Sequence, residues 1–254
     1  YANGGFTPLL FAAREGQIDA TRRLIAAGAD INAIAADGKN ALGLAIYNGQ
    51  FEVASLLVEN DADVNHADAE GFPPLFWAVD RRNMEWNPGF PWVEMTDPLP
   101  LIRQLLDAGA DPNTFVNNTP QSRRNFGGSP RTLFATSLMR AAYSADIELV
   151  QLLLDYGADP FILNTDNENA LLAASAYAWI DGYSQGRSTG ERLATIQLLV
   201  ELGADVNWAC DHGITPLMMA ANFGEVELIQ YLVDQGANLA AHDLGKKNNG
   251  AFGG

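Results

Sequence analysis

The chain has 254 residues, of which 48% are hydrophobic, so it is long and apolar enough to bury a sizeable core. Its net charge of -16 and isoelectric point near 4.4 argue against nucleic acid or an anionic membrane as the main partner, because phosphates repel such a field. Cys210 is the single cysteine, which excludes an internal disulfide. No apolar run approaches the roughly 18 residues of a membrane span, so we expect no membrane insertion.

A short pattern recurs along the chain with a basic period of 33 residues. Thr-Pro-Leu or a variant of it begins at Thr7, Asn40, Pro73, Thr136, Asn169 and Thr215. Gly-Ala-Asp or a variant follows at residues 28–30, 61–63, 109–111, 157–159, 203–205 and 236–238. Six copies at this period indicate a solenoid.

Each repeat predicts two antiparallel helices. Thr7 can cap a helix that has Pro8 at its first position, and Gly16 ends that helix. A second apolar stripe at helical spacing then runs to Gly28, and residues 29–32 read as a turn into the next repeat. In chain order we expect repeats at about 3–33, 36–66, 69–113, 131–161, 164–207 and 210–241, forming one array over residues 1–242.

These motifs resemble the ankyrin repeat family, and the match covers nearly the whole chain. The histidine that often follows Thr-Pro-Leu in that family is absent here, its place being taken, for example, by Leu10 and Met218. The resemblance implies an all-α solenoid of stacked helix-turn-helix repeats with hairpin-like finger loops. It also implies a non-catalytic role in protein binding through the concave face.

Three insertions interrupt the period, at about residues 82–96, 114–130 and 178–190. All three surround the fourth repeat, and long loops on a rigid scaffold often carry function. We therefore expect them to frame a partner site near that repeat. They supply aromatic anchors at Trp86, Trp92, Trp179 and Tyr183. The alternative is that these rings fold back into a local mini-core.

A window from Pro112 to Ala145 contains no Asp or Glu but holds Arg123, Arg124, Arg131 and Arg140. Arginine suits two-pronged contact with a carboxylate or phosphate, so an acidic segment or a carboxylated small molecule is one expected ligand. Pairing with acids of neighbouring repeats is the alternative.

By the resemblance, finger tips and the ends of first helices line the concave face. An exposed aromatic track is expected there, made of Tyr47, Phe72, Tyr143, Tyr177 and Phe223. Packing of each ring against the adjacent finger is the alternative.

We expect no catalytic residue, cofactor or metal site. His66, His212 and His242 lie at turns of different repeats, and with Cys210 they give no zinc-ligand spacing. No nucleophile elbow, phosphate loop or dinucleotide fingerprint occurs.

Neither end of the array looks capped, and the chain begins at Tyr1 rather than Met. Residues 243–254 read as a Gly/Asn-rich tail or the start of a further repeat. We therefore expect this chain to be a segment of a larger protein or part of an assembly.

The sequence thus predicts a protein-binding module with an unidentified protein partner. A small-ligand or enzymatic pocket under the inserted loops, or a regulatory or structural segment of a larger protein, are the alternatives.

Overall fold

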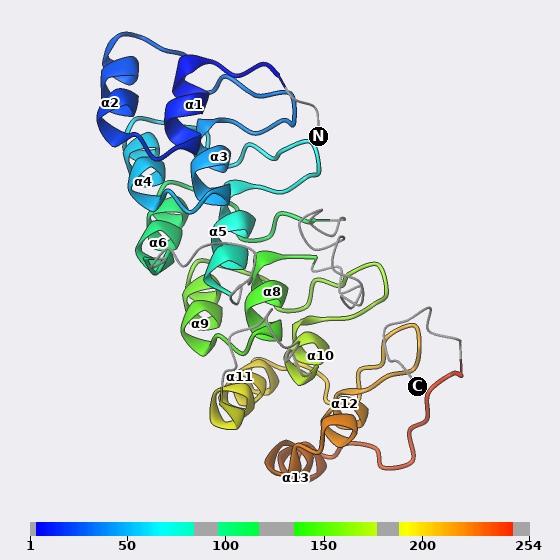
Figure 1. Ribbon diagram of the computed structural model, residues 1–254. Coiled ribbons are helices and arrows are strands. Elements are labelled where there is room, and N and C mark those ends of the chain that lie inside the picture. The colour runs from blue at the N-terminus through cyan, green and yellow to red at the C-terminus, as the bar shows by residue number, and fades with distance from the viewer. Residues whose placement is uncertain (1–3, 84–95, 117–134, 177–187, 246–254) are drawn as a thin grey trace. The chain divides into compact units, whose positions relative to one another are not determined.

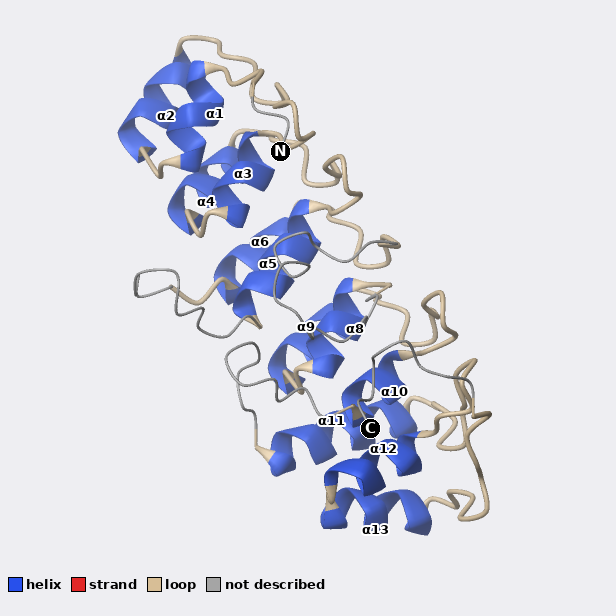
Figure 2. Cartoon of the chain, turned by 45° about the vertical axis from the view of Figure 1, so that its right-hand side comes forward, coloured by secondary structure: helices blue, strands red, loops and turns tan. Residues whose placement is uncertain are grey.

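A computed structural model of the chain describes residues 4–83, 96–116, 135–176 and 188–245. These residues form helices and loops with no strand, apart from an isolated bridge between Ile34 and Asn40 (Figures 1 and 2). The predicted all-α fold is therefore confirmed. The chain divides into two compact units, Tyr1–Arg82 with Gly89–Thr114 and Asn83–Pro88 with Phe115–Gly254, and each is described by itself.

The described residues of the first unit form three helix pairs. They are α1 (Pro8–Arg14) with α2 (Ile18–Ala26), α3 (Ala41–Tyr47) with α4 (Phe51–Glu59), and α5 (Pro74–Arg82) with α6 (Leu99–Asp107). The first helices α1, α3 and α5 contact one another in sequence, and α2, α4 and α6 do the same. Two helical layers result, and the loops that precede α3 and α5 extend away from both layers (Figure 1).

The second unit repeats this arrangement. The pairs in its described residues are α8 (Ser137–Tyr143) with α9 (Ile147–Asp155), α10 (Ala170–Ser175) with α11 (Thr189–Glu201), and α12 (Pro216–Phe223) with α13 (Val226–Asp234). Helix α10 contacts both α8 and α12, while α11 contacts α9. No helix in the described part of the chain is long and apolar enough to cross a lipid bilayer.

The predicted caps begin the first helices. In five of them the side-chain oxygen of the cap residue accepts a hydrogen bond from the backbone N–H three residues later. These cap residues are Thr7, Asn40, Thr136, Asn169 and Thr215. Each such cap satisfies an otherwise unpaired N–H and stabilises its helix by about 1 kcal/mol.

Asparagine side chains tie successive repeats together. The backbone N–H of Asp63 donates to Oδ1 of Asn32 at 2.9 Å, and that of Asp111 donates to Oδ1 of Asn65 at 2.9 Å. In the second unit the N–H of Asn238 donates to Oδ1 of Asn207 at 2.7 Å. The Ala-Asp-x-Asn turn therefore also sets the register between one repeat and the next.

Most of the three predicted insertions lies outside the described residues, but their flanks are visible. Arg82 ends α5 and forms an ion pair with Asp97, which stands just before α6. Ser188 and Glu191 form a reciprocal capping box at the start of α11. Thr189 and Gly190, predicted as the end of an insertion, are therefore the first turn of that helix.

Candidate functional site

The finger turn of the second repeat, residues 36–39, places Lys39 directly before the α3 cap. Oδ1 of Asp37 accepts a hydrogen bond from the backbone N–H of Lys39 at 3.2 Å, which holds the turn closed. Gly38 adopts φ +80°, and a Cβ added there would lie 2.4 Å from the backbone nitrogen of Ala69 in the next finger. Glycine is thus required for the two fingers to stack.

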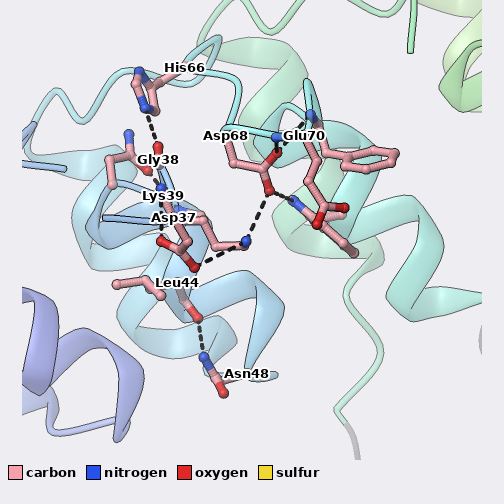
Figure 3. A network of polar contacts seen from close by, with 12 residues as sticks. Asp37, Gly38, Lys39, Leu44, Asn48, His66, Asp68 and Glu70 are labelled. Carbon is pink, nitrogen blue, oxygen red and sulfur yellow. Dashed lines mark hydrogen bonds and ion pairs between the residues drawn. The ribbon is translucent and has the colours of Figure 1, made fainter. Parts of the chain in front are cut away.

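Asp68, in the third finger, is the centre of the polar network in Figure 3. Its Oδ1 accepts hydrogen bonds from the backbone N–H groups of Glu70 and Phe72, both at 3.0 Å. Its Oδ2 accepts from Nε1 of Trp77 at 3.1 Å and lies 3.1 Å from Nζ of Lys39. The carboxylate therefore joins its own finger to the first helix of its repeat and to the preceding finger.

Lys39 is a cation shared between two carboxylates. Its Nζ lies 3.1 Å from Oδ2 of Asp68 and 3.3 Å from Oδ2 of Asp37. Burial alone would lower the pKa of Lys39, but the charges and hydrogen bonds of Asp68 and Asp37 outweigh it, so this pKa lies above its ordinary value. Lys39 therefore stays protonated at neutral pH, and its charge is balanced within the network.

Two aromatic rings lie beside this cation. The rings of Tyr47 and Trp77 meet edge to face with centroids 4.9 Å apart. Nζ of Lys39 lies 5.1 Å from the Tyr47 centroid and 5.6 Å from that of Trp77. The guanidinium carbon of Arg81 lies 5.3 Å from the Tyr47 centroid, so two cations contact one ring. We call Lys39, Tyr47, Trp77 and Arg81 the cation–aromatic cluster.

The exposed aromatic track predicted from the sequence is wrong at two positions. Phe72 is 1% exposed, because its ring packs on Phe76 at 5.1 Å and on Trp77 at 5.0 Å. Tyr143 is 7% exposed and belongs to α8, all of whose residues are buried. Tyr47 is half-buried and Phe223 is 38% exposed.

The other predicted contact residues lie outside the described part of the chain. They are Trp86, Trp92, Arg123, Arg124, Arg131, Tyr177, Trp179 and Tyr183. Their roles in partner binding stay predictions from the sequence.

Of the four arginines in the acid-free window, Arg140 is the one whose position is described. It is 1% exposed and lies in α8. Its guanidinium donates to Oγ of Ser144 and, at 2.8 Å, to the backbone oxygen of Asn83. Arg140 is therefore part of the interior and cannot belong to an accessible anion site.

In the fifth repeat, Glu168 occupies the position that Lys39 has in the second. Oε2 of Glu168 accepts a hydrogen bond from Nδ2 of Asn164 at 2.7 Å. Burial, with a smaller effect from the charge of Asp166, raises the pKa of Glu168, although the Asn164 bond and His212 oppose the shift. The same finger position thus carries a basic side chain in one unit and an acidic one in the other.

Sequence reasoning missed the importance of Asp68 and Trp77. The signal for Asp68 was its place three residues before Gly71, where an aspartate commonly closes a turn by accepting backbone N–H groups. Trp77 offered no comparable signal, because the equivalent positions hold Phe11, Leu44, Arg140, Ala173 and Met219.

Comparison with known proteins gives consistent matches. The family model for ankyrin repeats (3 copies) matches residues 9–86 and 138–243. The ankyrin repeat protein YahD of Escherichia coli (strain K12) is 27% identical over 228 residues, covering 90% of this chain and 95% of that protein. The ankyrin repeat, SAM and basic leucine zipper domain-containing protein 1 of Dasypus novemcinctus is 31% identical over 153 residues, which are 60% of this chain and 27% of that longer protein.

A solved structure supports the same conclusion about architecture. The crystal structure of an ankyrin repeat domain from Acinetobacter baumannii AYE superposes with a TM-score of 0.68 at 26% identity. The match covers 91% of this chain and 98% of that one.

Proposed function

Because the chain belongs to the ankyrin repeat family, whose members are generally protein-interaction modules, we propose that it binds a protein partner through the surface formed by its fingers and first helices. The repeats of this family generally carry no catalytic chemistry. The observation that supports this surface is the cation–aromatic cluster. Half-buried Tyr47 is held there by Trp77, Lys39 and Arg81 at the end of a first helix, beside a finger turn.

The cluster has the physical properties of a binding anchor. A tyrosine offers a large amphipathic area and has few rotatable bonds, so fixing it against a partner costs little conformational entropy. Three neighbouring side chains already restrict this ring, which lowers the ordering cost further. Arginine and tyrosine are also the residue types that most often dominate interface energetics.

Affinity measurements with surface variants test this proposal. The intact chain is used to capture a partner, the partner is identified by mass spectrometry, and its affinity is measured by titration. We expect Tyr47→Ala to weaken binding by about tenfold or more, the loss typical of a central aromatic anchor. The controls Glu52→Ala and Glu59→Ala change exposed residues of α4, on the second-helix layer, and are expected to leave affinity unchanged.

Thermal unfolding of each variant separates loss of contact from loss of structure. A partner whose affinity falls with the α4 variants but not with Tyr47→Ala would assign binding to the second-helix layer and refute the proposal.

We also propose that the inserted segments contribute to recognition of the same partner. Their aromatic content supports this idea, since Trp86, Trp92, Trp179 and Tyr183 are residues of the type favoured at interfaces. The test replaces residues 84–95 and 178–187 by short turns, leaving Arg82, Asp97 and the α11 cap in place. Unchanged partner affinity in both shortened chains would remove the insertions from the proposal.

A further inference from the structure

Two consecutive arginines at the end of α5 have different environments. Arg82 is 9% exposed and forms an ion pair with Asp97. Arg81 is half-buried, and none of the described residues accepts a hydrogen bond from its guanidinium. What holds Arg81 is the ring of Tyr47, 5.3 Å from the guanidinium carbon. The five N–H donors of Arg81 therefore have no acceptor among the described residues, while the ring contact restricts the side chain.

Water still reaches this guanidinium, because none of its nitrogens is among the buried polar atoms that lack a hydrogen-bond partner in the described part of the chain. Burial lowers the pKa of Arg81, although the charge of Asp80 opposes that shift. A ligand that supplied two acceptors in the guanidinium plane would replace water at a side chain that the Tyr47 ring already restricts, so little further ordering would be needed.

We propose that Arg81 is the receptor for one carboxylate side chain, Asp or Glu, of the protein partner. The carboxylate accepts two parallel N–H bonds from the guanidinium, and its methylene groups lie against the ring of Tyr47. This inference rests on the proposed function and specifies the chemistry that the partner presents at the cation–aromatic cluster. A fork-shaped pair of this kind adds orientation as well as affinity.

Local charge favours a carboxylate over a phosphate. The charge of Lys39 is already balanced by Asp37 and Asp68, and Asp80 lies next to Arg81 in α5. A phosphate group carries nearly two negative charges at neutral pH and would be repelled more strongly by these acids than a singly charged carboxylate. The net charge of -16 acts in the same direction.

The test is a nuclear magnetic resonance titration that follows the Nε–Hε signal of Arg81 in the full chain. The probes are three blocked tripeptides, acetyl-Gly-Glu-Gly-amide, its Gln counterpart and its phosphoserine counterpart. We expect the Glu peptide to shift the signal saturably at millimolar concentration and the Gln peptide to bind about tenfold more weakly. A phosphoserine peptide that bound more tightly than the Glu peptide would overturn the choice of a carboxylate.

Variants identify the group that binds. Arg81→Gln is expected to abolish saturable binding, and Arg81→Lys to weaken it severalfold, because a lysine keeps the charge but loses the fork. Arg23→Gln, an exposed residue of α2 in the same unit, removes an equal charge and is expected to have no effect. Equal weakening by Arg81→Gln and Arg23→Gln would reduce the effect to general electrostatics and overturn the inference.

A further variant tests for an internal ligand. Glu85 and Glu94 follow Arg81 in the sequence. If the unmodified chain does not respond to the Glu peptide but the Glu85→Gln, Glu94→Gln double variant does, the chain supplies its own carboxylate, and the inference of a partner carboxylate is wrong. Absence of binding in both chains also overturns it.

This failure can be told apart from failure of the proposed function. A partner captured in a Tyr47-dependent way, with an affinity insensitive to Arg81→Gln, would leave the proposed function standing and remove the carboxylate inference. Binding of the Glu peptide at Arg81, with no effect of any surface variant on protein capture, would keep a carboxylate site at Arg81 and remove the proposed function.

Discussion

Replacing Asp68 by asparagine should destabilise the first unit by about 3 kcal/mol. The amide oxygen of Asn can still accept from the backbone N–H groups of Glu70 and Phe72. Its NH₂ group, however, takes the place of the oxygen that accepts from Trp77 Nε1 and faces Lys39 Nζ. Asp68→Asn thus removes half of the contacts of this carboxylate while nearly preserving its shape.

The magnitude follows from the two donors left behind. Trp77 is 4% exposed, so its indole N–H would be buried without an acceptor, at a cost of about 1–3 kcal/mol. A charge-assisted hydrogen bond to Lys39 contributes about 1.5–3 kcal/mol, less here because Asp37 remains as a partner. The two effects together give the estimate.

The assay is urea unfolding of the variant and of the unmodified chain, followed by circular dichroism. Amide hydrogen exchange at Glu70 and Phe72 gives a local readout. Asp37→Asn is the matched control, since the Asp37 side chain is 30% exposed and its pair with Lys39 should contribute less than about 1 kcal/mol. Equal losses in Asp68→Asn and Asp37→Asn would refute the central role of Asp68.

Three other substitutions have defined outcomes. Burial raises the pKa of Glu168 in the folded state, so its carboxyl group lowers the stability of the fold as pH rises from the unfolded pKa through the folded pKa. Glu168→Gln should therefore be more stable than the unmodified chain at pH 7 and equally stable near pH 3. Melting temperatures that differ by the same amount across pH 3–8 would contradict this. Arg192 donates to the backbone oxygens of Ala174, in the last turn of α10, and of Ala176, which follows that helix, so Arg192→Met should cost about 2 kcal/mol in urea unfolding. An unchanged midpoint would show that this cap is dispensable. Exposed Asp61 adopts φ +63°, so Asp61→Gly should gain about 0.5–1 kcal/mol, and a loss of stability would indicate that the aspartate side chain is needed there.

The sequence predicts the backbone of this protein well because its repeats are governed by local chemistry. A capping hydroxyl or amide such as Thr7 or Asn40 acts on a backbone N–H three residues away, and Gly224 adopts the left-handed conformation that ends α12. Interactions over such short distances can be inferred from spacing alone.

The candidate site could be predicted only in part, because it depends on the direction in which each side chain points. The repeat pattern predicts an exposed position for both Tyr47 and Phe72, yet Phe72 is buried by Phe76 and Trp77, which share its repeat. Arg140 lies in a window of positive charge but points its guanidinium into the interior, toward Ser144 and a backbone oxygen. Residue type and position follow from the repeat in each case, whereas the direction of each side chain depends on the neighbours against which it packs.

The ion pair between Arg82 and Asp97 also bears on how the segment between them could be redesigned. It links the end of α5 to Asp97, two residues before α6, on either side of residues 84–95. With both attachment points fixed, doubling the length of that segment would add a loop-closure cost of only about 0.6 kcal/mol. Residues 84–95 could therefore serve as an exchangeable cassette, in which randomised or grafted sequences select new specificities while the helix pairs of the first unit stay unchanged.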